Sequence, residues 1–161
     1  MKNTGKRFEE NFRESVGGEI FFYRFRDGTS SWGGNGATRF QQTNMCDCEM
    51  FDGERLFLLE LKSVIGKSLP FGNIKDHQLN ELVEASCHKN IIAGFIIEFS
   101  SVDRCFFIGA RDMAYYMNNS GRKSMPLSYL ESKGLEIEVK KLRVNVRLDI
   151  EKFIKEVKWG I

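Results

Sequence analysis

The sequence has no long apolar run and is poor in proline, histidine and net charge. Its 161 residues include two prolines and two histidines and carry a net charge of +2. No apolar stretch approaches the roughly 20 residues that a membrane-spanning helix needs. The opening MKNTGKRFEEN is charged and lacks the apolar centre of a secretory signal. We therefore expect a soluble intracellular protein with no membrane partner, and the modest net charge names no partner class by itself.

Cysteine is also scarce. The four residues are Cys46, Cys48, Cys87 and Cys105, and in an intracellular protein such cysteines are typically reduced thiols. Cys46 and Cys48 could belong to a zinc site, but Cys-x-Cys is tighter than the usual ligand spacing, and Cys87 and His88 are adjacent on a predicted helix and diverge. We therefore favour free thiols over a zinc site.

Hydrophobic periodicity predicts a mixed α/β fold in a single domain, residues 1–161, with a central mixed β-sheet flanked by helices. Phe8, Phe12 and Val16 recur at steps of four and predict a first helix. The segment 27–44 is glycine-rich, irregular and long for a connection. The remaining pattern predicts strands over 19–25, 44–51, 54–62, 90–99, 104–110 and 135–144, and helices over 76–90, 110–119, 127–133 and 148–159.

The stretch LFLLELKSV, residues 56–64, begins as a strand buried on both faces and ends with charged residues. Side chains alternate along a strand, so Leu56, Leu58, Glu60 and Lys62 share one face. One face of the strand therefore stays apolar while the other becomes ionic.

Asp52-Gly53, just before this strand, is a strong signal for a two-residue hairpin turn. Such a turn places Asp47 opposite Leu58 and makes it a diagonal neighbour of Glu60, with Cβ atoms roughly 7 to 8 Å apart. Two carboxylates at that separation can both reach one magnesium ion, which binds oxygen at about 2.0 to 2.1 Å. The hairpin therefore predicts a cation site formed by Asp47 and Glu60.

Glu-x-Lys alone is weak support for a site, because it occurs four times in the chain. The other three copies have structural interpretations at a helix end, on the solvated face of a strand and on the last helix: Glu131/Lys133, Glu138/Lys140 and Glu156/Lys158. The competing interpretation of Glu60 is an ion pair with Lys62 at the edge of the sheet. Partly burying Asp47 beside Glu60 then costs several kcal/mol unless a cation compensates.

An aspartate, a hairpin and then Glu-x-Lys at a strand end resemble the catalytic core of PD-(D/E)XK nucleases. The flanking sequence narrows this resemblance to the RecU-type Holliday-junction resolvases of bacteria and their phages. The motifs that carry it are Asn3-Thr4-Gly5 with Glu9, the spacing of Asp47 and Glu60, KSLPFGNIKDHQ (67–78), FFIGARDMAYYM (106–117) and GRKSMP (121–126). The resemblance implies a restriction-endonuclease-like core.

The resemblance also implies roles for individual residues. Glu9, Asp47 and Glu60 bind a divalent metal, Mg²⁺ with Mn²⁺ as a substitute, and Lys62 orients or activates the attacking water. Gln78 or His77 supports the site from the following helix. The expected DNA-binding residues are mostly basic side chains, with one aromatic residue for stacking on bases: Lys67, Lys75, His77, Arg111, Arg122, Lys123, Arg39 and Trp32.

The implied activity is metal-dependent endodeoxyribonuclease cleavage of four-way junctions by paired symmetric nicks. A homodimer matches the two-fold symmetry of that substrate. No nucleotide cofactor is expected, and the expected location is the cytoplasm of a bacterial cell or a phage-infected host.

The sequence departs from the family in the segment 27–44, which replaces a longer stalk that is expected to enter the junction centre. Cys46 and Cys48 also replace small, hydroxylic or aromatic neighbours of the aspartate. Two alternatives stay open: a linear-duplex or flap nuclease on the same core, which the short segment makes plausible, or a non-catalytic DNA-binding recombination module whose carboxylates only stabilise the hairpin.

Overall fold

The computed structural model describes residues 4–26 and 43–157. The predicted glycine-rich segment 27–44 therefore lies outside the described residues, except for its last two positions. The described elements are α1 (Thr4–Ser15), β1 (Phe21–Arg24), β2 (Cys48–Phe51), β3 (Leu56–Val64), β4 (Ser68–Pro70), the 3-10 helix η1 (Phe71–Asn73), α2 (Asp76–Ala85), β5 (Ile91–Phe99), β6 (Arg104–Gly109), α3 (Ala110–Asn119), β7 (Ser124–Pro126), α4 (Leu127–Lys133), β8 (Leu135–Ile137), β9 (Val139–Lys141), β10 (Val146–Leu148) and α5 (Ile150–Glu156).

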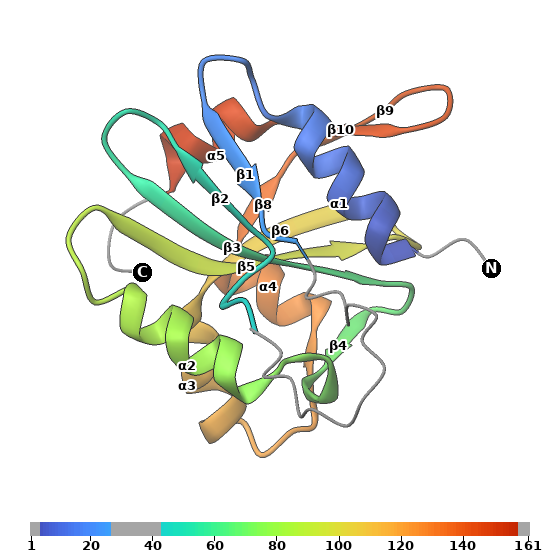
Figure 1. Ribbon diagram of the computed structural model, residues 1–161. Coiled ribbons are helices and arrows are strands. Elements are labelled where there is room, and N and C mark those ends of the chain that lie inside the picture. The colour runs from blue at the N-terminus through green and yellow to red at the C-terminus, as the bar shows by residue number, and fades with distance from the viewer. Residues whose placement is uncertain (1–3, 27–42, 158–161) are drawn as a thin grey trace, which may run out of the picture.

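Six strands form a central sheet in the order β1-β2-β3-β5-β6-β8 (Figure 1). β3 and β5 are parallel, and the other neighbouring pairs are antiparallel. Parallel strands need a long crossover connection, and here the chain between β3 and β5 includes α2. Two short sheets pair β4 with β7 and β9 with β10. The predicted central mixed sheet is confirmed.

Helices cover both faces of this sheet. On one face α1 and α5 contribute the buried residues Phe8, Phe12 and Phe153. On the other face α2 contributes Leu82 and α3 contributes Met113, and α4 lies on the same side. β3 and β5, at the centre, are covered on both faces, which explains their nearly continuous apolar sequences.

The connection between β2 and β3 is longer than predicted. Cys48 pairs with Leu59 and Phe51 pairs with Leu56, so residues 52–55 form the connection and the predicted two-residue turn is wrong. The observed register differs from the predicted one by two residues. Because side chains alternate with a period of two, an even shift leaves the paired side chains on their predicted faces.

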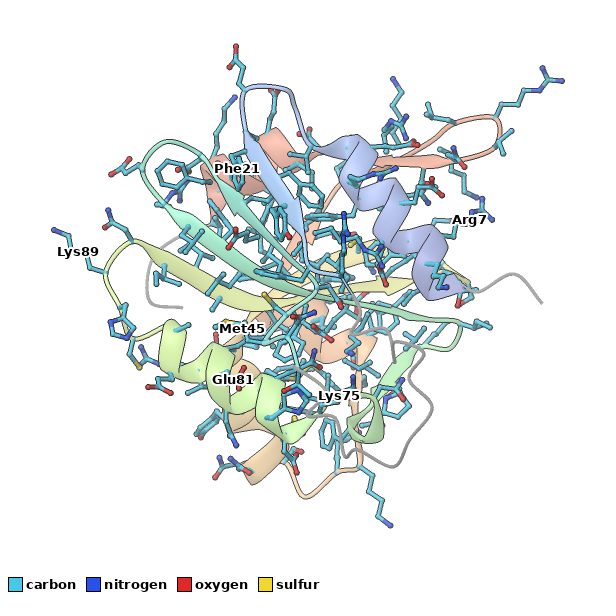
Figure 2. All side chains as sticks on the ribbon, in the orientation of Figure 1. Arg7, Phe21, Met45, Lys75, Glu81 and Lys89 are labelled. Atoms are coloured by element: carbon cyan, nitrogen blue, oxygen red, sulfur yellow. The ribbon has the colours of Figure 1, made fainter. Side chains whose placement is uncertain are left out.

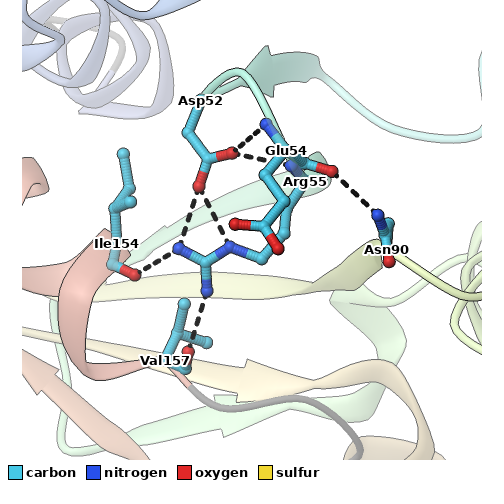
Figure 3. A network of polar contacts seen from close by, with 6 residues as sticks. All are labelled: Asp52, Glu54, Arg55, Asn90, Ile154 and Val157. Carbon is cyan, nitrogen blue, oxygen red and sulfur yellow. Dashed lines mark hydrogen bonds and ion pairs between the residues drawn. The ribbon is translucent and has the colours of Figure 1, made fainter.

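Arg55 explains the longer connection (Figure 3). Asp52 Oδ1 accepts hydrogen bonds from the backbone N–H groups of Glu54, at 2.9 Å, and Arg55, at 2.7 Å. The Arg55 guanidinium contacts Asp52 Oδ2 and donates to the carbonyl oxygens of Ile154, at 2.7 Å, and Val157, at 3.1 Å. Contacts with the end of α5 therefore fix the hairpin connection.

The strand predicted over 135–144 is also wrong as one element. β8 pairs with β6 in the central sheet, whereas β9 pairs with β10 outside it. The two strands separate at Glu138, whose carbonyl oxygen accepts a hydrogen bond from the backbone N–H of Asp149 at 2.9 Å. The helices predicted over 110–119 and 127–133 are confirmed, and α2 ends at Ala85, earlier than predicted.

Candidate active site

β3 places Glu60 and Lys62 on the face of the sheet that α2 covers. The Glu60 side chain is buried, with 2% of the residue exposed. Lys62 Nζ donates to Glu60 Oε1 at 2.7 Å, and Gln78 Nε2, from α2, donates to Glu60 Oε2 at 3.0 Å. Both carboxylate oxygens of Glu60 are therefore held by side chains that the sequence predicted to lie near it.

Gln78 is itself buried, with 5% of the residue exposed. Its Oε1 atom is buried and has no hydrogen-bond partner among the described residues. A buried acceptor without a partner is costly, so this oxygen is suited to accept from a donor or to face a cation.

Asp47 lies just before β2 and is fixed to the neighbouring strands. Its backbone N–H donates to the Leu59 carbonyl at 3.2 Å, and its own carbonyl accepts from the Phe25 N–H at 2.9 Å. Its carboxylate oxygen Oδ2 accepts from the backbone N–H of Leu61 at 2.8 Å. These bonds direct the Asp47 carboxylate toward β3, beside the strand position of Glu60.

The Asp47 carboxylate, which is bonded to the residue after Glu60, lies close enough to Glu60 to repel its negative charge. Burial and the nearby Asp47 carboxylate raise the pKa of Glu60 from its ordinary 4.5 to about 7, against the opposing effects of Lys62 and Lys75. Glu60 is therefore partly protonated at neutral pH. Lys75, the residue before α2, is a predicted DNA-binding cation that lowers the pKa of this carboxylate (Figure 2).

The donor atoms fit a hard divalent cation. The Asp47 and Glu60 carboxylates and the unpartnered Gln78 Oε1 are oxygen donors of the kind that Mg²⁺ prefers. A cation beside them would reduce the repulsion that raises the pKa of Glu60. Among the residues that the structure describes, however, no group of three His, Cys, Asp or Glu residues could hold a metal ion.

Glu9 lies on α1 and forms an ion pair with Arg24 of β1. The two side chains line an open cavity of about 280 Å³ together with Lys6, Glu10 and Arg13. The structure does not group Glu9 with Asp47 and Glu60 as one cluster, so its predicted role as a metal ligand stays a prediction. Sequence reasoning missed Arg24; the only signal was that it is the one cation in the predicted strand 19–25.

Cys46 and Cys48 flank Asp47 and are buried. Burial raises the pKa of Cys46 to about 12, with a further contribution from Glu60, and raises the pKa of Cys48 well above its ordinary value. Both side chains are therefore protonated thiols at neutral pH. A thiol in this form is a poor nucleophile and a poor metal ligand.

Several predicted DNA-binding cations gather beside α2 at the β4–β7 pair. The Phe71 N–H donates to the Lys123 carbonyl at 3.0 Å, which brings Lys123 to η1, and the Leu127 N–H donates to the Lys67 carbonyl at 2.9 Å. Lys67, Lys75 and Lys123 are exposed. The pairing of β4 with β7 thus brings together two basic segments that are far apart in the sequence.

The other predicted DNA-binding residues are more scattered. Arg122 is exposed and its backbone N–H donates to Ser120 Oγ at 3.2 Å. Arg111 is exposed at the start of α3, and His77 is partly buried in the first turn of α2. Trp32 and Arg39 lie outside the described residues. No helix in the described part of the chain is long and apolar enough to cross a membrane.

Residues 33–156 match the family model described as "RecU: Recombination protein U". The chain belongs to the RecU family. The SPbeta prophage-derived protein YotM of Bacillus subtilis is 32% identical to this RecU-family chain over 171 residues, covering 96% of the chain and 87% of the relative.

Two Holliday junction resolvases named RecU match a shorter part of this RecU-family chain. The protein from Streptococcus sanguinis is 34% identical over 77 residues, and that from Pediococcus pentosaceus is 33% identical over 75 residues. These alignments cover 47% and 44% of the chain and only 38% and 36% of the two resolvases.

The solved structure of Hjc, a Holliday junction resolvase from Archaeoglobus fulgidus, resembles this RecU-family chain with a TM-score of 0.51 and 17% sequence identity. The similarity covers 82% of the chain and 95% of Hjc. At this identity the likeness concerns the fold, and it confirms the predicted restriction-endonuclease-like core.

Proposed function

We propose that this chain is a divalent-metal-dependent endodeoxyribonuclease that resolves four-way DNA junctions. The observation that carries the proposal is the proximity of the Asp47 and Glu60 carboxylates at a buried strand, with Lys62 on Glu60. Membership of the RecU family and the junction-resolving relatives named above support the choice of substrate.

In this proposal Asp47 and Glu60 hold the metal, and Glu9 adds a ligand from α1. Mg²⁺ is the expected ion, with Mn²⁺ as a substitute, because the donors are hard oxygens. When bound, the ion supplies Lewis acidity and lowers the pKa of a coordinated water. Gln78 fixes the orientation of Glu60 through Oε2.

Lys62 has a separate role in the proposal. Its Nζ atom lies 2.7 Å from Glu60 Oε1, and the Lys62 side chain keeps 17% of its surface exposed. A fixed positive charge of this kind positions a nucleophilic water and stabilises charge that develops on the scissile phosphate. Lys62 therefore acts as a positioning and electrostatic group, and no role as the sole general base is needed.

The basic surface at β4, β7 and the start of α2 is proposed to hold the DNA backbone. Phosphate contacts fix the position of the duplex without reading its sequence. The proposed contacts include residues beside the site, Arg111 and Arg122 farther from it, and two residues from the segment between β1 and β2: Lys67, Lys75, His77, Lys123, Arg111, Arg122, Arg39 and Trp32.

Paired nicks require two active sites, so we propose a homodimer with two-fold symmetry. A two-fold dimer presents two equivalent sites to a substrate that is itself close to two-fold symmetric. Sedimentation of only monomer at micromolar concentration would exclude this arrangement.

The experiment that tests the function compares a labelled synthetic four-way junction with its linear duplex, each incubated with Mg²⁺ or with EDTA. Metal-dependent symmetric nicking of the junction alone is the expected result. Equal cutting of both substrates would instead support a linear-duplex or flap nuclease, which the short segment 27–44 favours. Binding without cutting would support a non-catalytic recombination module.

A further inference from the structure

The β9–β10 hairpin is the second concentration of positive charge in the described chain. It forms a sheet of its own and projects past α1, on the side of the molecule away from α2 and α3 (Figure 1). Residues 139–148, VKKLRVNVRL, include four basic residues and no acidic residue: Lys140, Lys141, Arg143 and Arg147. These four basic residues are separate from the charged residues around Glu60.

The base of the hairpin is firmly attached to the body of the protein. Arg147 forms an ion pair with Glu14 of α1 at 2.8 Å, and Lys141 forms one with Asp103 at 2.7 Å. The Leu148 N–H also donates to Ser15 Oγ at 3.0 Å. Two of the four cations therefore hold the hairpin in place.

The remaining two cations are exposed. Lys140 and Arg143 form no ion pair within the described residues, although Lys140 lines an open cavity that it shares with the acidic residues Glu138, Asp149 and Glu151. Between the strands, Leu142 is 44% exposed and Val144 is 71% exposed, and the Leu142 N–H closes the turn on the Asn145 carbonyl at 2.8 Å. The tip thus presents apolar side chains flanked by exposed basic side chains.

We propose that this hairpin is a second DNA-binding surface, which grips the phosphate backbone of a duplex arm beyond the catalytic region. The partner is duplex DNA because exposed lysine and arginine side chains on a hairpin that carries no acidic residue suit contacts with backbone phosphates. The apolar tip suits packing against sugar and groove walls, as in proteins that insert apolar side chains into DNA grooves. This inference rests on the proposed function in one respect, the substrate: a branched DNA molecule has duplex arms that can extend past α1.

The test is the salt dependence of junction binding, measured by fluorescence anisotropy in EDTA so that no cleavage occurs. The variant is Lys140→Glu/Arg143→Glu. The matched control is Lys89→Glu/Lys133→Glu, which has the same change of net charge; both control residues are exposed, and Lys89 lies on the other side of the molecule (Figure 2). Circular dichroism checks that both variants keep the wild-type fold.

Loss of two phosphate contacts should reduce the slope of log K against log salt by about 2 and weaken binding at about 0.1 M salt roughly 60-fold. The control should keep the wild-type slope. An unchanged slope in the hairpin variant would overturn the inference. If that variant kept the wild-type slope but lost binding to anionic vesicles, or lost self-association, the hairpin would bind a membrane or a second copy of the chain and not DNA.

Failure of the proposed function gives a different pattern. If wild-type protein binds the junction but never cuts it, while the hairpin variant still shows the reduced slope, the DNA-binding surface stands and the nuclease fails. If wild-type protein cuts the junction and the variant binds it with the wild-type slope, the nuclease stands and the surface fails.

Discussion

Lys62 Nζ lies 2.7 Å from Glu60 Oε1, on the same face of β3 and two residues farther along the strand. The pair is partly buried, with side-chain exposures of 17% for Lys62 and 3% for Glu60. Lys62 thus offsets part of the repulsion between Glu60 and Asp47, with a smaller contribution from Lys75. In the proposed mechanism the same positive charge acts on the scissile phosphate.

Replacing Lys62 with alanine should lower the rate of junction cleavage by about 10² to 10³, because a fixed charge that stabilises the transition state is lost. Single-turnover cleavage with saturating protein measures this effect apart from binding. The matched control is Lys133→Ala, which changes another Glu-x-Lys copy; there Glu131 pairs with Arg104 instead. Equal rates for wild type and Lys62→Ala would remove Lys62 from the mechanism.

The four cysteines should differ in their reactivity because they differ in burial. Cys87 is exposed, whereas Cys46, Cys48 and Cys105 are buried with their pKa values raised by burial. Only a thiolate reacts with iodoacetamide, so folded protein should gain one adduct at pH 8 and urea-unfolded protein should gain four. Mass spectrometry counts the adducts, and Cys87→Ser should leave the folded protein unlabelled. Rapid labelling of Cys46 in folded protein would contradict the described packing beside Asp47.

Gly94 of β5 faces a crowded contact with β6. A Cβ atom at this position would lie 2.3 Å from the Ile108 carbonyl oxygen and 2.7 Å from the Phe107 ring. Gly94→Ala should therefore lower the free energy of unfolding by about 3 kcal/mol, because the backbone of a central strand must shift. Gly18→Ala is the control, since a Cβ there meets nothing within 4 Å. Urea unfolding of the two variants compares their stabilities, and a similar stability for both would contradict the strand packing.

The sequence predicted the shared face of Glu60 and Lys62 because alternation along a strand is a local rule. It did not predict the hairpin register. That register depends on Arg55, whose hydrogen bonds reach the carbonyl groups of Ile154 and Val157 about a hundred residues later, and no local turn rule contains this information. Asp47 and Glu60 share one face of the sheet despite the wrong register, because the register changed by an even number of residues.

Other features depended on tertiary packing from the start. The ion pair of Glu9 with Arg24 exists because α1 lies beside β1, and the sequence gives no distance between those elements. The separation of β8 from β9 depends on the Glu138 carbonyl receiving the Asp149 N–H, although the residues on both sides of Glu138 continue one alternating pattern. Periodicity identifies strands, but pairing decides which sheet each strand joins.

The raised pKa of Glu60 predicts a stability that depends on pH. Folded Glu60 binds its proton more tightly than the unfolded chain does, since its pKa is about 7 instead of 4.5. The free energy of unfolding should therefore fall as pH rises between these values, by about 3 kcal/mol, and then level off. Urea unfolding in EDTA from pH 5 to pH 8 measures this change. In Glu60→Gln the decrease in the free energy of unfolding that comes from Glu60 should be absent. In Asp47→Asn the decrease should be smaller, because removing the Asp47 charge lowers the pKa of Glu60.

Adding Mg²⁺ should restore the stability that ionised Glu60 removes, because a cation that binds the folded protein stabilises it according to its concentration. The effect should be larger at pH 8 than at pH 5.5, since binding must displace the proton from Glu60. Glu60→Gln should show a much smaller response at both pH values. If Mg²⁺ stabilised wild type and Glu60→Gln equally, the ion would bind elsewhere, and the Asp47 and Glu60 carboxylates would be a pair held by Lys62 and Gln78 without a metal.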